Sequence, residues 1–203
     1  ANMKMEAELE NRSLKNELEL LKSQINPHFL FNTLNNIDSL IHTSPAVASQ
    51  TLITLSELLR YMIYETQADK VPLDKEIDYI NRYVELQRLR FKSPKAILLT
   101  VENHSTVTTI APMLFVPFVE NAFKYAQNQG TLPIIEILLR NTGESLSFTC
   151  KNYYNPDQKS TQKTGGVGLE NVKRRLELLY KGNHELEIID EKNTFTVELK
   201  LFQ

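Results

Sequence analysis

The side chain of His28 has the chemistry of a nucleophile, because a neutral imidazole attacks electrophiles at physiological pH. It directly follows Pro27, inside an amphipathic helix that the sequence predicts over residues 4–43. A proline within a helix lacks a backbone donor and kinks the helix, so we expect the imidazole to be exposed at the kink. A lone histidine on an apolar helix is more often a packed core residue, and it is the neighbouring motifs that favour a nucleophile here.

Glu120, Asn121 and Lys124 form a polar stripe along one side of a helix predicted over residues 112–128. Apolar residues occupy the other side at helical spacing: Phe115, Val119, Ala122, Phe123 and Ala126. An amide oxygen is a ligand for Mg²⁺, an ammonium group pairs with phosphate, and a carboxylate acts on a proton donor or a water. The same spacing is also that of an ordinary Glu–Lys pair on a helix surface, so the stripe alone does not establish a site.

A glycine cluster, Gly165, Gly166 and Gly168, opens a helix predicted over residues 168–181 and holds three of the six glycines. Glycine lets backbone N–H groups approach a phosphate closely, and a helix N-terminus favours anions. Residues 155–164 before the cluster are polar almost throughout, and a loop of that length is typical of a lid or of a disordered segment. The cluster therefore predicts phosphate binding under a closing loop, although glycines before a helix are a weak signal by themselves.

Two helices must position His28. Leucines and an isoleucine repeat with coiled-coil spacing ahead of it, at Leu14, Leu18, Leu21 and Ile25. Residues 43–45 predict the end of this helix and the start of another, which is predicted over residues 46–66. Its expected apolar face is Leu52, Leu55, Leu58, Leu59 and Met62. One antiparallel hairpin cannot cover this much apolar surface, so we expect two hairpins to pair as a dimeric four-helix bundle.

The pattern changes to mixed helix and strand after residues 67–70. Helices are predicted over 74–91, 112–128 and 168–181, and strands over 97–102, 107–110, 134–140, 145–151, 185–190 and 194–202. Strands and helices that interleave without a regular βαβ repeat indicate an α+β fold, a sandwich with helices on one sheet face. We therefore expect a first domain over 1–69 and a second over 70–203.

Composition excludes several classes of protein. The chain has 23 basic and 25 acidic residues, a net charge of −2 that argues against direct nucleic-acid binding. It contains no apolar run of about 18 residues that would span a membrane. The single Cys150 cannot form an intrachain disulfide, which fits a reducing compartment. Because the sequence opens in charged helix without a methionine, we expect it to be a piece of a longer protein.

Taken together and in this order, the three motifs resemble the LytS-type sensor histidine kinases over residues 20–203. Residues 24–35 resemble that family's histidine box, 118–122 its N box and 166–171 its second glycine box. Residues 71–76 and 87–91 resemble the segments that begin its ATP-binding domain. The resemblance implies a dimerisation and histidine-phosphotransfer hairpin, followed by a Bergerat-fold ATP-binding domain of the GHKL superfamily.

The same resemblance implies roles for single residues. His28 would accept the γ-phosphoryl group of ATP and pass it to an aspartate of a response regulator. Asn121 would bind Mg²⁺, and Glu120 and Lys124 would lie beside the phosphates. The remaining ATP-binding residues implied in this way are Tyr125, Gly166, Gly168, Leu169 and Asn171. The resemblance also implies a homodimer, a regulator with a LytTR-type DNA-binding output, and a membrane sensor upstream, so that the chain would be the cytoplasmic portion of an inner-membrane protein.

The sequence departs from the family pattern where adenine is read. Kinases of this superfamily usually carry Asp-x-Gly-x-Gly after a strand, whereas residues 151–155 contain no glycine. Asn152 is the expected substitute, since its amide oxygen still accepts a hydrogen bond but without the charge of a carboxylate. Tyr125 and Ala126 stand where the family commonly has His-Gly, and Phe29 stands where many kinases have an acidic residue. The identity of the general base is therefore open, with Glu120 as one candidate.

Two other functions are open at this point. The missing Asp-x-Gly-x-Gly motif suggests a catalytically weak or inactive dimeric signalling scaffold that transmits by contact alone. A GHKL ATPase that hydrolyses ATP without a phosphohistidine is the other, and it leaves the segment around Pro27 and His28 unexplained. The signal, the choice of response regulator, and transfer within or between protomers are not encoded in readable motifs.

Overall fold

The computed structural model describes residues 26–105, 108–128, 130, 132–156 and 167–202. The chain divides into two compact units, residues 1–67 and 68–203. The predicted coiled coil at residues 14–25 lies outside the described residues. No described helix is long and apolar enough to cross a membrane.

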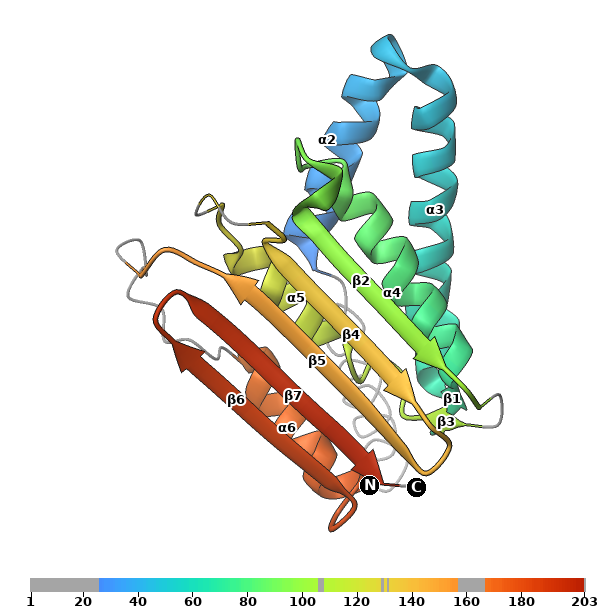
Figure 1. Cartoon of the computed structure of the whole chain (residues 1–203). Coiled ribbons are helices and arrows are strands. Elements are labelled where there is room, and N and C mark those ends of the chain that lie inside the picture. Colours follow the sequence, from blue (N-terminus) through green and yellow to red (C-terminus); the bar gives the residue numbers. More distant parts are fainter. Residues whose placement is uncertain (1–25, 106–107, 129, 131, 157–166, 203) are drawn as a thin grey trace, which may run out of the picture. The chain divides into compact units, whose positions relative to one another are not determined.

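The first unit is a helical hairpin of α2 (Pro27–Thr43) and α3 (Pro45–Tyr64), followed by a 3-10 turn at Glu65–Gln67 (Figure 1). Prolines occupy the first turns of both helices, where their missing N–H groups leave no helical hydrogen bond unmade. The two helices pack on each other through buried residues of both. On α2 these are Phe29, Thr33 and Ile37, and on α3 they are Ala48, Thr51, Thr54, Leu55, Leu58 and Met62.

The helix that carries His28 begins at Pro27, so the expectation of a kink inside one continuous helix is wrong. Asn26 has extended backbone angles (φ −73°, ψ 103°), and its side chain caps the helix by accepting a hydrogen bond from Phe29 N at 3.2 Å. The proline therefore starts a helix and does not bend one. Of the expected apolar face of the second helix, Leu55, Leu58 and Met62 are buried in the hairpin, whereas Leu52 is 49% exposed in the single chain.

The second unit contains, within the described residues, a five-stranded sheet with the order β2-β4-β5-β7-β6. Its strands are β2 (Ile97–Asn103), β4 (Ile135–Asn141), β5 (Ser145–Tyr153), β6 (His184–Glu191) and β7 (Thr194–Phe202). The β2–β4 pair is parallel and the other pairs are antiparallel. Each of these strands overlaps a predicted one, and the alternating burial along β5 explains why the period-2 pattern was readable.

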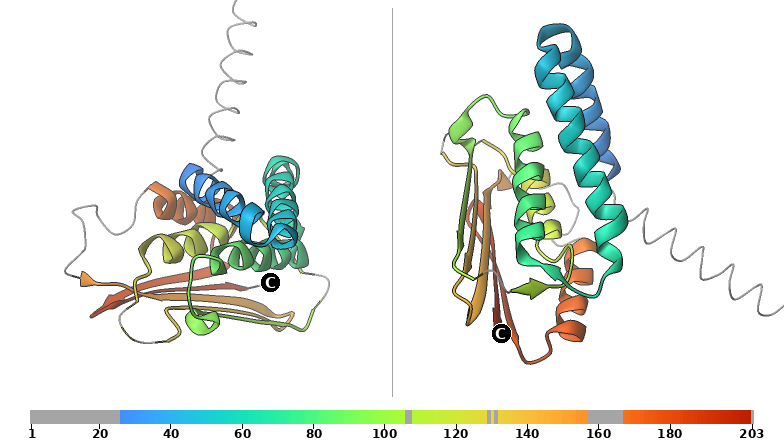
Figure 2. Two further views of the ribbon diagram at one scale, coloured as in Figure 1. Left: turned by 90° about the horizontal axis from the view of Figure 1, so that it is seen from above. Right: turned by 90° about the vertical axis from the view of Figure 1, so that its right-hand side faces the viewer.

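Three helices of this unit cover one face of the sheet, so it is a two-layer α/β sandwich (Figure 2). They are α4 (Leu73–Arg88), α5 (Val116–Tyr125) and α6 (Val167–Leu179). A second 3-10 turn, Pro94–Ala96, leads into β2. The core lies between the two layers and includes Phe115, Leu139, Leu146, Phe148, Leu176 and Leu199.

A two-stranded ribbon joins the start of this unit to the segment before α5. Strand β1 (Val71–Pro72) pairs antiparallel with β3 (Thr109–Ile110), so that Val71 faces Ile110. The sequence predicted a strand over 107–110 but none at 71–72. It also started the helix of the polar stripe too early, because α5 begins at Val116 and the predicted start was 112. Met113 has a positive φ of 56°, which no right-handed helix allows.

Candidate functional site

His28 lies in the first turn of α2 with its side chain exposed. The capping of the helix by Asn26 fixes the backbone on which the imidazole stands. One turn further along, Asn32 Nδ2 lies 3.3 Å from His28 Nδ1 and 3.2 Å from His28 Nε2. The Asn32 amide therefore contacts the imidazole ring from the next turn of the same helix.

Asn32 is a residue that the sequence reasoning missed. Its signal was nevertheless present, because residues four apart lie above one another on the same helix face. At position 29, where many kinases have an acidic residue, Phe29 is buried. A contact partner for His28 is therefore found at i+4 and not at i+1.

The polar stripe on α5 is held in place by apolar contacts on the opposite side of the helix. The Phe115 ring stacks on the Phe148 ring of β5, with 4.6 Å between the centroids. The Cys150 thiol donates to Phe118 O at 3.8 Å. Beyond the helix, Gln127 N donates to Tyr153 O at 2.9 Å. These contacts make α5 and β5 run side by side from the start of the helix to its end.

The stripe lies at the edge of the core. Glu120 and Asn121 are partly buried, whereas Lys124 is exposed. The Lys124 ammonium lies 5.0 Å from the ring centroid of Tyr125, which is close enough for a cation–π contact. The predicted apolar side is confirmed by the burial of Val119, Ala122 and Phe123.

Glu120 is the titratable group of this stripe with a strongly altered proton affinity. Burial raises its pKa to about 7, because the surrounding protein solvates a carboxylate less well than water does. Tyr79 and Tyr83 of α4 lie near it, and its negative charge adds to the burial that raises the pKa of both tyrosines. A carboxyl group that gains or loses a proton near neutral pH is suited to acid–base chemistry.

Asn152 lies on the helix-facing side of β5, two residues after Cys150, and is 1% exposed. The pairing of α5 with β5 places it beside the second half of α5, which carries Asn121, Lys124 and Tyr125. Within the described residues its amide nitrogen Nδ2 is buried without a hydrogen-bond partner. Such a group is costly and calls for an explanation, and a bound ligand with an acceptor atom supplies one.

The helix α6 carries the described part of the glycine cluster. Gly168 has open space where a Cβ would stand, so packing does not require glycine there. Leu169 is buried in the core at 4% exposure, and Asn171 is exposed. The predicted residues Gly165 and Gly166 lie outside the described residues. The part that is described thus presents Gly168 and Asn171 to solvent and uses Leu169 for packing.

The structure brings five predicted residues into one region of the second unit: Glu120, Asn121, Lys124, Tyr125 and Asn152. His28 belongs to the first unit. Among the described residues, no group of three or more His, Cys, Asp or Glu side chains could hold a metal ion. An amide oxygen such as that of Asn121 is a type of ligand that Mg²⁺ accepts in combination with oxygen atoms of a bound ligand.

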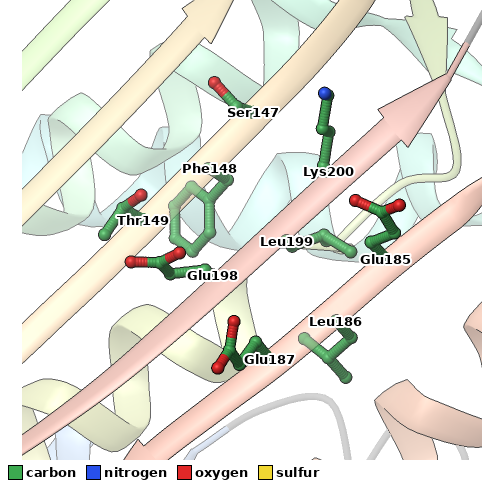
Figure 3. A pocket seen from close by; sticks show the side chains of 9 residues that line it. All are labelled: Ser147, Phe148, Thr149, Glu185, Leu186, Glu187, Glu198, Leu199 and Lys200. Atoms are coloured by element: carbon green, nitrogen blue, oxygen red, sulfur yellow. The ribbon is translucent and has the colours of Figure 1, made fainter.

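A pocket lies elsewhere, on the sheet face away from the helices (Figure 3). It is lined by Ser147, Phe148, Thr149, Glu185, Leu186, Glu187, Glu198, Leu199 and Lys200. Glu187 stands opposite Glu198 in the β6–β7 pair, where two like charges repel each other. None of the predicted site residues lines this pocket.

Comparison with known proteins gives a consistent result at the level of the family. A family model described as histidine kinase matches residues 16–95. Sensor protein kinase HptS of Staphylococcus aureus (strain USA300) is 28% identical over 192 residues, which cover 89% of this chain and 37% of HptS. The chain therefore spans little more than a third of the length of the curated relatives that it matches.

Solved structures show likeness of fold. A bacterial phosphotransferase is 10% identical, with a TM-score of 0.51 and coverage of 89% of this chain and 94% of that chain. The histidine kinase domain of a blue-light activated histidine kinase from Erythrobacter litoralis EL346 is 19% identical, with a TM-score of 0.44 and coverage of 94% and 95%. Residues 16–95 match the histidine kinase family model, and 89% of the chain is similar to part of a sensor histidine kinase.

Proposed function

We propose that this chain is the kinase core of a LytS-type sensor histidine kinase, which uses ATP and Mg²⁺ to phosphorylate its own His28. The observation that carries the proposal is the state of His28. Its imidazole is exposed, contacted by the Asn32 amide, and lies inside the segment that matches histidine kinases. An accessible imidazole is what a phosphoacceptor requires.

The second unit, within a domain that we assign to residues 70–203, would bind the nucleotide in a GHKL-type site. Asn152 fits an adenine ring, because its amide oxygen accepts from an exocyclic amino group while the buried Nδ2 donates to a ring nitrogen. Asn121 would hold Mg²⁺ through its amide oxygen, and Lys124 would pair with a phosphate. Tyr125, Gly166, Gly168, Leu169 and Asn171 complete the proposed site.

When bound, ATP supplies the phosphoryl group and Mg²⁺ neutralises charge on the phosphate oxygens. A ring nitrogen of His28 attacks the γ-phosphorus as the bond to the β–γ bridging oxygen breaks, so that ADP leaves with that electron pair. The histidine then carries a new N–P bond. The proton on its other ring nitrogen must be released for the ring to return to neutrality.

Glu120 is the candidate for the general base of this step. A carboxylate is a useful base at neutral pH when its pKa lies near that pH, and burial raises the pKa of Glu120 to about 7. The Asn32 amide would meanwhile hold the imidazole in the orientation for attack. Glu120 would thus accept the proton, and Asn32 would orient the imidazole.

We assign residues 1–69 to dimerisation and phosphotransfer, as a four-helix bundle made by two hairpins. Large apolar side chains of the hairpin that are exposed in the single chain support this: Phe31, Leu34, Ile41, Val47, Leu52, Ile53 and Ile63. The phosphoryl group would pass from His28 to an aspartate of a response regulator with a LytTR-type output. An upstream membrane sensor would make this chain the cytoplasmic portion of an inner-membrane protein.

The experiment that tests the proposal is incubation of the chain with Mg-ATP, followed by measurement of acid-labile, base-stable phosphate. His42→Ala is the matched control for His28→Ala, because His42 is an exposed histidine in the last turn of the same helix. We expect label on the wild type and on His42→Ala, and none on His28→Ala. Equal labelling of all three would refute His28 as the acceptor, and saturable Mg-ATP binding without label would leave only the nucleotide-binding part of the proposal.

A further inference from the structure

We infer that Glu76 is a positioning residue for the polar stripe, because its buried carboxylate fixes the turn from which α5 starts. This inference rests on the proposed function, since it concerns how the Mg²⁺ and phosphate ligands of that site are aimed. Glu76 belongs to the segment 71–76, which the proposed chemistry does not use.

Glu76 lies in the first turn of α4 and is completely buried, at 0% exposure. Its Oε1 accepts a hydrogen bond of 2.6 Å from Met113 N, 37 residues further along the chain. Burial of a carboxyl group is expensive, and an apolar side chain of similar volume often gives equal or greater stability. A glutamate at this position therefore points to a task other than filling the core.

The partner of Glu76 is a strained part of the backbone. Met113 has a φ of 56°, a conformation that is uncommon and unfavourable for residues other than glycine. It persists only where surrounding contacts hold it. The hydrogen bond from Met113 N to Glu76 is such a contact, and it lies three residues before the first residue of α5.

Further bonds anchor the same segment. Leu73 N donates to Thr108 O at 2.9 Å, next to the pairing of β1 with β3. Directly after the C-terminal end of α6, the Tyr180 hydroxyl accepts a hydrogen bond from Ala111 N at 2.8 Å. The segment that precedes α5 is thus tied both to the start of α4 and to the residue that follows α6.

The turn determines how the helix is rotated. The residue that caps α5, Phe115, makes no side-chain capping bond, so its side chain does not define the start of the helix. Because a helix is rigid over a few turns, the direction of Glu120 and Asn121 depends on the turn before Val116 as well as on the apolar contacts that hold the opposite side of α5. A change of the hydrogen bond at Met113 would therefore shift the start of α5 and, with it, Asn121 in the second turn of the helix.

The test compares Glu76→Met with Glu76→Gln. Methionine has a similar length and removes the acceptor, whereas glutamine keeps an oxygen that accepts from Met113 N. ATP affinity is measured with Mg²⁺ and with EDTA, and the ratio gives the gain that depends on Mg²⁺. Amide hydrogen exchange over residues 114–119 is measured in parallel without nucleotide.

We expect the ratio of ATP affinity with Mg²⁺ to ATP affinity in EDTA to be about tenfold lower in Glu76→Met than in the wild type. This is the size expected for the loss of one buried hydrogen bond. ATP affinity in EDTA should stay within about twofold of the wild type. Exchange at 114–119 should become about tenfold faster than in the wild type. Glu76→Gln should stay within about threefold of the wild type in both measurements.

Two results would overturn the inference. One is that Glu76→Met keeps both the Mg²⁺-dependent gain in ATP affinity and the amide hydrogen exchange rates of the wild type. The other is an equal loss of ATP affinity with and without Mg²⁺ together with faster exchange throughout the unit, which would make Glu76 a core residue only. If Glu76→Met does not fold, Tyr180→Phe decides, because it removes the acceptor of Ala111 N from the same turn. An unchanged gain and unchanged exchange in that variant would contradict the inference.

Failure of the proposed function looks different. A wild-type chain that binds no ATP removes the nucleotide site but leaves the exchange measurement, which needs no ligand. Faster exchange at 114–119 in Glu76→Met but not in Glu76→Gln would then still support the role of Glu76 in holding α5.

Discussion

Glu120 holds a proton at pH values where most glutamates have already lost theirs. The pKa of about 7 means that the folded chain binds this proton more tightly than the unfolded chain, in which a glutamate has a pKa of 4.5. As pH rises from 4.5 through 7, ionisation therefore removes stability from the fold. Partial exposure to water keeps the loss below the roughly 3 kcal/mol that the full shift would give.

We expect autophosphorylation of the wild type to rise with pH between about 6 and 8, because only the ionised Glu120 accepts a proton. Glu120→Gln should be slow at all pH values, should lose this rise, and should be more stable than the wild type at pH 8. Phosphate incorporation and thermal unfolding at matched pH values check both parts. A steep rise that persists in Glu120→Gln would assign the titration to another group.

Asn152 should show opposed effects on stability and on binding. Replacement by leucine removes a buried amide nitrogen that has no partner among the described residues, so we expect the fold to gain about 1 kcal/mol. The same change removes the proposed contacts to the nucleobase and should weaken ATP binding at least about tenfold. Urea unfolding and calorimetric titration measure the two effects. A loss of stability with unchanged ATP affinity would show that Asn152 serves packing alone.

At the scale of elements, α6 carries a residue that helices disfavour in its first turn. Gly168 lies in its first turn, and a Cβ there would meet no atom within 4 Å. We expect Gly168→Ala to raise stability by up to about 1 kcal/mol, because alanine loses less backbone freedom in a helix. If a phosphate approaches this backbone, the same change should weaken Mg-ATP binding, and Glu170→Ala in the same turn serves as control. Unchanged ATP affinity in Gly168→Ala would remove Gly168 from the site.

Elements with a clear hydrophobic period were predictable from the sequence. The strands of the large sheet and helices α3, α4 and α6 lie close to their predicted positions because burial alternates along them with period 2 or 3.6. The two-residue strand β1 could not be read, because it has no period of its own and exists only by pairing with β3. The late start of α5 was hidden for a similar reason, since a distant carboxylate holds Met113 out of the helix.

The site was predictable to the extent that its residues share one helix. Glu120, Asn121 and Lys124 follow from helical spacing alone, whereas the burial of Asn152 beside them depends on the pairing of α5 with β5. The raised pKa of Glu120 comes from desolvation within the folded unit, which no local sequence pattern encodes. Asn32 was within reach of a sequence argument, because only the i+4 position relative to His28 was needed.

At the scale of the whole molecule, the hairpin exposes several large apolar side chains. Phe31 is one of them and is 65% exposed. We expect Phe31→Asp to convert a dimer into a monomer, because a charge at the proposed interface would be buried without a partner. Leu178→Asp is the matched control, since Leu178 is 73% exposed but lies on α6 of the second unit. Light scattering at several protein concentrations measures the molar mass of the wild type and of both variants. An equal mass for all three would place the interface elsewhere.

The ribbon of β1 and β3 decides where the second unit can be separated from the hairpin. Val71 is 2% exposed and pairs with Ile110, although it precedes the first helix of the unit. A shortened chain that starts at Leu73 would expose Ile110, leave β3 without its partner strand and free the segment that leads into α5. Cleavage between residues 67 and 70 leaves that pairing whole, so a protease that cuts there should release a folded second unit, whereas a cut after Pro72 should release an unstable one.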